Sequence, residues 1–532
     1  MQFILLYRIV KLKIPTFQHI CGIRIKRALV SVSNKEGIVE FARELQKFGV
    51  DILASGGTYK ALSDAGLKVK AVSDITKYPE MLGGRLKTLH PAIHGGILAE
   101  RSDKQHMKEL KDLDITPIDM VVSNLYPFED VAKDVPNNLD NIIENIDIGG
   151  PALIRSAAKN YEYVTVVVNP SQYPIVIEEL KTKGVISKET RYVLAQEAFR
   201  HTSEYDSNIH EFLKSKSGQS FPEILHLKFR KVQELRYGEN PHQKAALYKE
   251  LHSQDAAVVD AVKLNGRELS YNNVLDTDAA LRIVREFGKP TVTIIKHTNP
   301  CSVACGKTLV EAYEKAFSSD NESAFGGIVG LNGNVNVALA EKLSEMFYDI
   351  IAAPGYDESA LEILKRRKNL IILKLDASDH RNQSMYVTKV DGGVLVQEHD
   401  TKGLDNIDVV TKIKPTEEQL ETMKFAWKVV KHVKSNAMVV AKDEQTFGIG
   451  IGQTSRVNAV KIALDKAGEN SRNAVLASDG FFPFRDSIDL AAKYGISAII
   501  QPGGSIKDKE VIQAADEHSI SMAFTGIRAF KH

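Results

Sequence analysis

The decapeptide TVTIIKHTNP, residues 291–300, indicates an α/β protein with its chemistry at the end of a strand. Residues 291–295 are β-prone or apolar, which predicts a short buried strand. Pro300 cannot donate to a central ladder, so the strand is expected to stop there. Lys296 and His297 would then lie at the carboxyl end of the strand, where open α/β sheets place reactive groups. Histidine can take a proton near neutral pH and lysine can stabilise negative charge, although polar residues simply facing water are an equal alternative.

Composition is typical of a globular chain of roughly three or four structural units. Of the 532 residues, 43% are hydrophobic and 26% charged, and the formal net charge is +1. This balance gives no indication of nucleic acid or an anionic membrane as a partner, and no apolar run reaches the length of a membrane span. Three cysteines are too few for a disulfide framework and favour a reducing compartment, so we expect a cytoplasmic protein.

The first 26 residues differ from the rest of the chain. They carry several basic residues, and the first acidic residue of the sequence is Glu36. We expect an extension outside the fold, either disordered or the product of a misassigned start. An organelle transit peptide is the alternative, because such peptides are basic and poor in acids.

Strands and helices alternate from residue 27 onwards. RALVSVS and VDILAS predict strands, and NKEGIVEFARELQKFG and YKALSDAG predict the helices that follow them. This order predicts a parallel sheet with right-handed crossovers. Both strand-to-helix turns suit a phosphate, because free N–H groups and the helix dipole attract anions; simple caps and turns are the alternative. The turn residues are Ser33, Asn34 and Lys35 in the first turn, and Ser55, Gly56, Gly57 and Thr58 in the second.

The segment MLGGRLKTLHPAIHGGILAE, residues 81–100, is rich in glycine and in bases. Arg85 and Lys87 within it suit a phosphorylated or otherwise anionic ligand. His90 and His94 have a spacing found in metal sites, but a proline lies between them and no carboxylate or cysteine completes a set. We therefore predict no metal site here.

An acid, a phenol and two amines of this half could meet at one edge of the sheet. These residues are Asp147, Tyr126, Lys87 and Lys159. Together they could move protons, whereas each alone would ordinarily be a surface residue.

The motifs of this half resemble those of IMP cyclohydrolase, which has a methylglyoxal synthase-like fold and forms the amino-terminal half of a bifunctional purine biosynthesis enzyme. SVSNKEG, SGGT, GGRLKTLHPAIHGGIL, NLYPF, IDIGG and RSAAKN occur in the order of that family. A simple methylglyoxal synthase would end near residue 170, and this chain continues.

A domain boundary is predicted at SKSGQSFPE, residues 215–223, which has the composition of a linker. The first domain would span residues 27–215 with a helical connector at its end, and the second would span residues 223–532. In the second, three phenylalanines lie beside Asp486 in FFPFRD. They are either core plus a helix cap, or a clamp for a flat ring whose amino group the carboxylate binds, such as a folate pterin.

Two rival cofactor sites are rejected on spacing. The glycines of GIGIGQTSR lie within an alternating strand and do not form G-x-G-x-x-G, so nicotinamide binding is not expected. Cys301 and Cys305 are one residue too far apart for a zinc deaminase, and the chain contains no H-x-E. We expect buried, inert cysteines without zinc.

The second half resembles AICAR transformylase, the other half of the same bifunctional enzyme. The matching motifs are LRYGENPHQ, ELSYNN, IIKHTNPC, SNAMVVA, GIGIGQTSR, FFPFRDSID and QPGGSI. The resemblance covers nearly all of residues 27–532 and implies a cytidine deaminase-like fold without zinc. Ser302 and Ser487 depart from residues common in the family, and neither removes a proposed acid, base or cation.

The resemblance implies formyl transfer from 10-formyltetrahydrofolate, a co-substrate, to AICAR, with no tightly bound cofactor. His297 would handle the proton, Lys296 would support charge, and Asn436 matches an active-site amide. The positions implied to bind ribotide or folate are Arg236, Tyr237, Asn273, Gly326, Asp349, Arg456, Val457, Phe481, Phe484, Asp486, Ser505, Ile506 and Arg528.

For the first half the resemblance implies dehydrative closure of the formylated ribotide, FAICAR, to IMP. Lys159 would be the main proton-transfer residue, assisted by Lys87, Tyr126 and Asp147. The implied substrate-binding positions are the two turns named above with Arg85, Thr88, Ser123, Asn124 and Ile148. A regulatory domain that only senses a nucleotide is the alternative. The family also implies a homodimer that shares its transformylase site, with small-molecule substrates and neither nucleic acid nor membrane as partner.

Overall fold

The computed structural model describes residues 22–126, 128, 139–215, 221–251, 257–377, 385–404 and 406–532. Most of the predicted extension, residues 1–21, and the middle of the predicted linker, residues 216–220, lie outside these ranges. The chain divides into two compact units, Met1–His226 and Leu227–His532.

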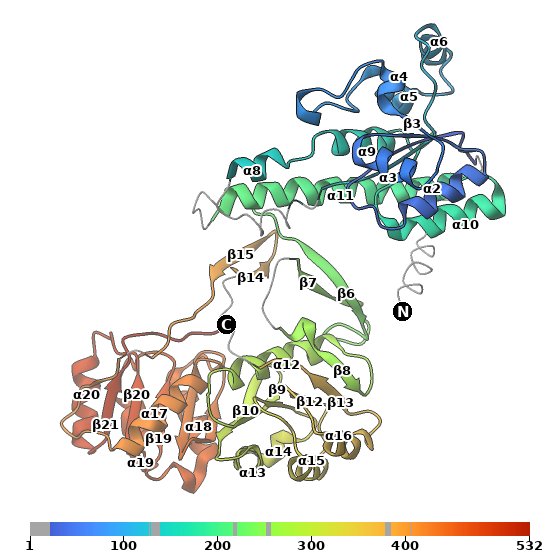
Figure 1. The fold of residues 1–532 in the computed structure, drawn as a ribbon. Coiled ribbons are helices and arrows are strands. Elements are labelled where there is room, and N and C mark those ends of the chain that lie inside the picture. Colours follow the sequence, from blue (N-terminus) through green and yellow to red (C-terminus); the bar gives the residue numbers. More distant parts are fainter. Residues whose placement is uncertain are drawn as a thin grey trace. The chain divides into compact units, whose positions relative to one another are not determined.

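The first unit is built on a parallel sheet with strand order β3-β2-β1-β4-β5, which confirms the predicted α/β fold. Strands β1, β2, β4 and β5 are largely buried, as expected where crossover helices cover a parallel sheet, and β3 is partly exposed. The long helix α11 packs against α9 and β5 (Figure 1). The elements are β1 (Arg27–Val32), α2 (Ile38–Lys47), β2 (Asp51–Ala54), α3 (Gly56–Asp64), β3 (Val69–Ala71), α4 (Val72–Thr76), η1 (Leu82–Gly84), α5 (Pro91–Leu98), α6 (Lys104–Asp112), β4 (Met120–Asn124), α8 (Leu139–Glu144), α9 (Gly149–Lys159), β5 (Thr165–Val167), η2 (Pro170–Gln172), α10 (Tyr173–Lys183) and α11 (Lys188–Ser215).

The second unit contains one large mixed sheet made of two halves with the same order of elements. In each half a helix leads into an antiparallel hairpin, and a helix follows that hairpin before three parallel strands linked by helices. The first half comprises α12 (Tyr271–Val284), β9 (Thr291–Lys296), β10 (Asn299–Cys305), α13 (Leu309–Ser319), α14 (Asn321–Ala324), β11 (Ile328–Leu331), α15 (Val337–Ser344), β12 (Ile350–Ala353), α16 (Glu358–Lys365) and β13 (Ile371–Lys374). The second comprises α17 (Glu417–Val430), β17 (Met438–Lys442), β18 (Gln445–Gly450), α18 (Arg456–Ala467), η4 (Gly468–Ser471), β19 (Val475–Ser478), α19 (Asp486–Lys493), β20 (Ala498–Gln501), α20 (Asp508–Glu517) and β21 (Ser521–Phe524).

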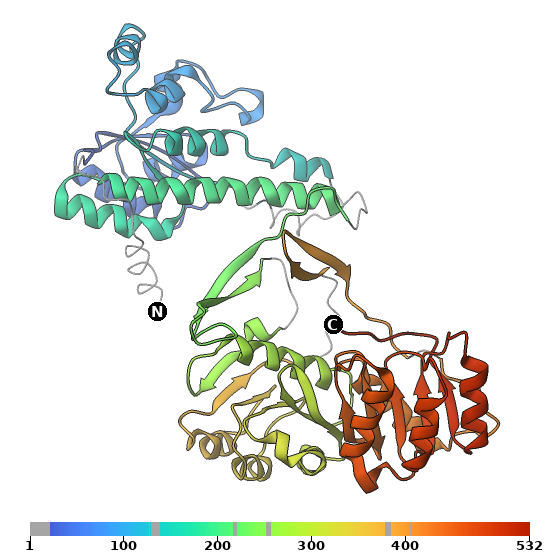
Figure 2. The same cartoon turned by 180° about the vertical axis from the view of Figure 1, so that it is seen from behind.

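The two halves join where β10 pairs with β18, so the strand order is β16-β21-β20-β19-β17-β18-β10-β9-β11-β12-β13-β8. Figure 2 shows them side by side, green to yellow and orange to red. Two hairpins, β6–β7 and β14–β15, form separate two-stranded sheets. The remaining elements are β6 (Phe229–Leu235), β7 (Ala245–Glu250), η3 (Val258–Asp260), β8 (Val262–Asn265), β14 (Met385–Val390), β15 (Gly393–Glu398) and β16 (Asp408–Val409).

The course of the chain after Lys296 differs from the prediction. Strand β9 ends at Lys296, but the chain turns through two residues and re-enters the sheet as β10, which contains Pro300. A register irregularity between Pro300 and Ser302 marks a bulge in the β9–β10 pair. A bulge leaves a residue outside the ladder, and proline is tolerated there because it has no N–H to donate.

The glycines of FGIGIG allow helix α18 to lie directly on strand β18. A Cβ atom at Gly448 would be 1.9 Å from the Ala463 carbonyl oxygen, and one at Gly450 would be 2.1 Å from the Ala459 carbonyl oxygen. A side chain at either position would therefore push the helix off the sheet.

We expect Gly448→Ala to lower the free energy of unfolding of the second unit by about 1–3 kcal/mol, the usual cost of overpacking. Gly288→Ala is the matched control, because no atom lies within 4 Å of its added Cβ. Denaturant titration followed by fluorescence isolates this unit, since Trp427 is the only tryptophan of the chain and is buried in α17. Equal midpoints for the two variants would contradict the close packing of α18 on β18.

Candidate active sites

The carboxyl ends of β1, β2 and β4 form one edge of the first sheet, and Asn124 at the end of β4 organises it. Its side-chain oxygen accepts hydrogen bonds from the backbone N–H groups of Ser33 at 2.7 Å and Asn34 at 2.9 Å. Its amide nitrogen donates to the Asn34 carbonyl at 3.0 Å. The side chain of Asn124 therefore fixes the first predicted phosphate turn. The Lys35 amine reaches back to the Ser33 carbonyl at 3.4 Å.

The second predicted turn opens α3, and its residues have different roles. The Thr58 hydroxyl accepts from the Val32 N–H and donates to the Val32 carbonyl, so this buried side chain ties α3 to β1 and is not free for a ligand. Gly56 has φ +49, and a Cβ there would be 3.2 Å from the Lys87 amine. Glycine at this position lets the amine sit directly over the turn. Gly57 faces Lys35 in the same way, with 3.7 Å between the added Cβ and the Lys35 amine.

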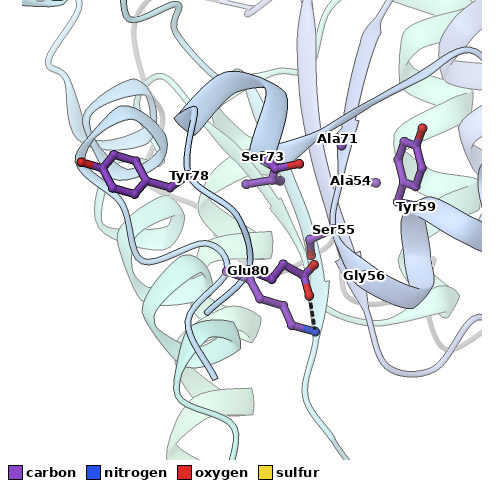
Figure 3. A pocket seen from close by; sticks show the side chains of 10 residues that line it. Ala54, Ser55, Gly56, Tyr59, Ala71, Ser73, Tyr78 and Glu80 are labelled. Atoms are coloured by element: carbon purple, nitrogen blue, oxygen red, sulfur yellow. Dashed lines mark ion pairs between the residues drawn. The ribbon is translucent and has the colours of Figure 1, made fainter. Parts of the chain in front are cut away.

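A cavity of about 340 Å³ lies beside this turn (Figure 3). Its lining includes Ser55, Gly56, Tyr59, Glu80 and Lys87. The Lys87 amine lies 3.4 Å from a Glu80 carboxylate oxygen, shown by the dashed line. Glu80 was not predicted from the sequence. Its position just before the basic segment 81–100 was the signal that could have indicated it.

Asp147 lies within the electrostatic reach of Lys87. Its carboxylate accepts from the Gly150 N–H at 2.8 Å. Burial raises the pKa of the Asp147 carboxyl, against the opposing influence of the Gly150 and Gly149 N–H groups and of the Lys87 charge. Thr88 is buried close by, 3.1 Å from where a Cβ of Gly149 would lie. The structure thus brings an amine and a carboxyl group together as predicted for this edge.

Lys159 lies at the opposite end of α9 from Asp147, so the expectation that all four groups meet at one sheet edge stays a prediction. Asp147 lies two residues before α9, and Lys159 is the last residue of that eleven-residue helix. A helix rises 1.5 Å per residue, so about 15 Å separates its ends. Tyr126 follows β4 at the expected edge and is 45% exposed.

Of the remaining residues predicted to bind substrate in the first unit, some side chains are engaged with other residues and some are not. Arg85 forms an ion pair with Glu144, so its guanidinium is engaged. Ile148 is exposed just before α9. The Ser123 hydroxyl is buried and has no hydrogen-bond partner among the described residues.

In the second unit the predicted Lys296-His297 pair lies at a tight hairpin turn. His297 and Thr298 both have positive φ, 55° and 62°, and link β9 to β10. Asp276 of α12 holds the turn, since its carboxylate accepts from the His297 N–H at 3.3 Å and the Thr298 N–H at 2.6 Å. Burial raises the pKa of the Asp276 carboxyl. The His297 side chain is exposed and not locked in the apolar core.

The Lys296 amine points to the start of the neighbouring strand β11. It donates to the Phe325 carbonyl at 3.1 Å, next to Gly326, which has φ +71. Asp349 immediately precedes β12 at the same sheet edge and pairs with Arg267 at 2.8 Å. This part of the edge therefore carries the Lys296 amine and the Arg267–Asp349 ion pair.

Three other predicted positions precede β9 in the chain. The guanidinium of Arg236 stacks 4.7 Å from the Tyr237 ring centre and donates to the Tyr237 hydroxyl at 3.0 Å. The side chain of Asn273 is buried in a capping box with Ser270 at the start of α12. Asn273 thus has a structural role that the sequence analysis missed.

A second polar cluster lies at the same edge, around Asn436. The Asn436 side-chain oxygen accepts from Arg456 at 2.7 Å, and Arg456 also donates to Asp479 at 2.6 Å and to Ser478 at 2.8 Å. Asp479 is fully buried and was not predicted as a site residue. Its charge fixes the guanidinium that holds the Asn436 amide.

The aromatic clamp is only partly as predicted. Phe482 is buried in the core, whereas Phe481 and Phe484 are 42% and 55% exposed. Asp486 begins α19 and accepts from the Ser487 N–H at 2.7 Å. Ile506, after β20, is fully exposed at 102%.

The other predicted positions lie near these groups. Val457 is in the first turn of α18, beside Arg456. The Ser505 N–H donates to Asp508 at 3.1 Å. Arg528 stacks on Phe530, 4.3 Å from the ring centre.

The two cysteines of the rejected zinc motif have thiol pKa values that burial raises to about 11. Both are therefore protonated near neutral pH, and a thiolate is the form that binds metal. Within the described ranges, histidine, cysteine, aspartate and glutamate form no group of three or more that could hold a metal ion.

A family model described as AICARFT/IMPCHase bienzyme matches residues 157–466, more than half of the chain. The chain belongs to this bienzyme family. A second model, described as MGS-like domain, matches residues 37–152. The predicted combination of a methylglyoxal synthase-like domain with a transformylase region is confirmed by these matches.

Relatives share half of their residues with this chain over nearly its whole length. The bifunctional purine biosynthesis protein PurH of Acetivibrio thermocellus is 52% identical over 513 residues, which are 96% of this chain and 100% of that protein. The protein of the same name from Anoxybacillus flavithermus is 50% identical over 509 residues, 95% of this chain and 100% of that protein. The crystal structure of ForH aligns at 34% identity over 36% of this chain and 99% of its own, with a TM-score of 0.32.

As a member of the bienzyme family, the chain is an enzyme of purine biosynthesis with AICAR formyltransferase and IMP cyclohydrolase activities. The amino-terminal unit is accordingly catalytic, and the nucleotide-sensing alternative is not favoured. Across the described residues, no helix combines the length and apolar character needed to cross a bilayer.

Proposed function

We propose that the second unit transfers the formyl group at the edge where β9, β11, β17 and β19 end or begin, with 10-formyltetrahydrofolate as donor. The 5-amino group of AICAR is a poor nucleophile, because its lone pair is delocalised into the ring. Its attack on the formyl carbon forms a tetrahedral oxyanion, and collapse of that intermediate releases N10 of the folate. The amine must lose a proton during this step, and N10 must gain one.

The observation that supports this assignment is the exposed His297 imidazole beside the Lys296 amine on a rigid turn. Asp276 accepts two backbone hydrogen bonds from the turn, so the backbone that carries the imidazole is held in place. His297 takes the amine proton, and Lys296 stabilises the developing charge. Asn436, oriented by Arg456, supplies an amide to the same reaction.

We propose that the first unit closes the ring at the Lys87–Asp147 cluster. The carboxamide nitrogen attacks the formyl carbon, and the former formyl oxygen leaves as water. This step is intramolecular, so holding the ribotide in a folded conformation supplies much of the rate. Lys87 polarises the formyl oxygen, Asp147 and Tyr126 exchange protons, and the two turns bind the phosphate and ribose. The proton-transfer role that the resemblance implies for Lys159 stays a prediction, given its place at the far end of α9.

A homodimer that shares the transformylase site is supported by the spread of the predicted contacts. Lys296 ends β9, whereas Ser505 and Ile506 follow β20, five strands away in the sheet order. Neighbouring strands lie about 4.8 Å apart, so the two groups are about 24 Å apart. One small ribotide and one pterin do not span this distance, and a second subunit would bring the complementary group to each end.

Mixing two inactive variants tests the shared site. His297→Ala and Asp486→Asn should each lose transfer, the second by losing the carboxylate partner of the pterin. After subunit exchange, random pairing gives mixed dimers with one intact site, so about a quarter of the wild-type activity should return. A mixture no more active than its parents would mean that each subunit carries a complete site.

For the same protein we propose a cytoplasmic location and no tightly bound cofactor.

A further inference from the structure

The carboxyl-terminal tail, residues 525–532, returns from β21 across the edge that carries the transformylase residues (Figure 1). The Ala529 N–H donates to the Asp479 carbonyl at 2.9 Å, which places the tail beside the Arg456 cluster. The Phe530 ring lies 5.9 Å from the Arg456 guanidinium. The tail therefore packs beside the Arg456 side chain that binds Asn436.

Lys531 attaches this tail to the loop that precedes Asn436. Its backbone carbonyl accepts from the Ser435 N–H at 3.0 Å, and its amine donates to the His432 carbonyl at 2.9 Å. The loop is therefore held at both ends by a single tail residue. The charged groups that act on this amine are Arg282 and Lys434, which lower its pKa, and Asp278, which raises it.

Lys531 is partly exposed, and desolvation together with the Arg282 charge lowers the pKa of its amine to about 8. The hydrogen bond to the His432 carbonyl offsets part of this desolvation, so the amine and the loop stabilise each other.

The loop, residues 432–436, connects the two halves of the proposed transformylase site. The Lys434 N–H donates to the Asn299 side chain at 3.1 Å, and Asn299 donates to the His297 carbonyl at 2.9 Å. At the other end of the loop, Asn436 is bound to Arg456. A displacement of this loop would move the imidazole turn and the amide relative to each other.

We propose that Lys531 is a positioning residue for formyl transfer, which fixes the 432–436 loop and through it the distance between His297 and Asn436. This inference rests on the proposed roles of those two residues. Lys531 acts through the loop and not on the substrate.

The test is Lys531→Met, which keeps the apolar stem and removes the amine. We expect kcat for formyl transfer to fall about tenfold or more, since small misplacements of reacting groups are costly, with little change in KM for AICAR. Lys531→Arg should recover most of kcat, because a guanidinium can still donate to the His432 carbonyl. Lys461→Met, on the exposed face of α18, is the matched control and should transfer at the wild-type rate.

Two further measurements on the same preparations complete the test. Ring closure, which occurs in the other unit, should be unchanged, and the Trp427 unfolding midpoint should stay close to wild type. Wild-type kcat in Lys531→Met would overturn the proposal, as would a loss of activity that only follows unfolding of the unit. Either result leaves the role of His297 intact, since His297→Ala tests that role separately.

Discussion

Replacing His297 with alanine should lower kcat for formyl transfer by about 10²- to 10⁴-fold, the usual contribution of one general base. The backbone of the turn is held by Asp276 through N–H groups that alanine retains, so the fold of the hairpin should survive. Binding of AICAR should persist, because the imidazole acts on the proton and not on the phosphate. Stopped-assay kinetics with 10-formyltetrahydrofolate, together with equilibrium binding of AICAR, measure both quantities.

The matched control for this variant is His518→Ala. His518 is a surface histidine that pairs with Asp489 at 2.7 Å, away from the hairpin turn in the sequence and the sheet. It should transfer at a near wild-type rate. Near-normal transfer by His297→Ala would remove the imidazole from the mechanism and leave Lys296 and Asn436 as the only proposed groups.

Replacing Lys87 with alanine should lower kcat for ring closure by about 10²-fold or more, as loss of a donor to a developing negative charge does elsewhere. The Lys87 amine lies over Gly56 and pairs with Glu80, whereas the Lys35 amine lies over Gly57 at the same turn. Formyl transfer should be unaffected. The assay supplies FAICAR and follows the ultraviolet absorbance of the closed purine ring.

Two further variants sharpen this prediction. Lys60→Ala changes an exposed lysine of α3 in the same unit and should close the ring normally. In Lys87→Ala the Asp147 carboxyl loses a neighbouring positive charge, so its already raised pKa should rise further. Any residual activity should then decline at a higher pH on acidification than in the wild type, if the carboxylate form is active. A ring-closure rate equal to that of wild type would exclude Lys87 as a catalytic residue.

The strands and their functional ends were predictable because the signal is local. TVTIIK is apolar and β-prone over its whole length, and the polar residues after it could only follow the strand. The same holds for the strand–turn–helix repeats that carry Ser33 and Gly56. Patterns of this kind need no knowledge of the rest of the chain.

One prediction was wrong because a rule on local sequence did not hold in the folded sheet. Pro300 was expected to end strand pairing, but a bulge lets the chain fold back as β10 with proline inside it. Lys159 was grouped with Asp147 from the sequence, and helix α9 lies between the two residues. That grouping stays a prediction.

Contacts between distant parts of the chain were beyond the reach of the pattern. Asp479 binds Arg456 across 23 positions and Lys531 binds the His432 carbonyl across 99. The repeat of two similar halves in the second unit was also missed, because the halves share an order of elements and not a visible motif.

The assignment of one reaction to each unit is tested most directly by giving AICAR and 10-formyltetrahydrofolate together to the Lys87→Ala and His297→Ala proteins. The products are then identified. Two separate sites acting in succession predict that Lys87→Ala accumulates FAICAR, while His297→Ala leaves AICAR unchanged yet converts added FAICAR to IMP. Formation of IMP from AICAR at the wild-type rate by either variant would contradict the assignment of ring closure to the first unit and formyl transfer to the second.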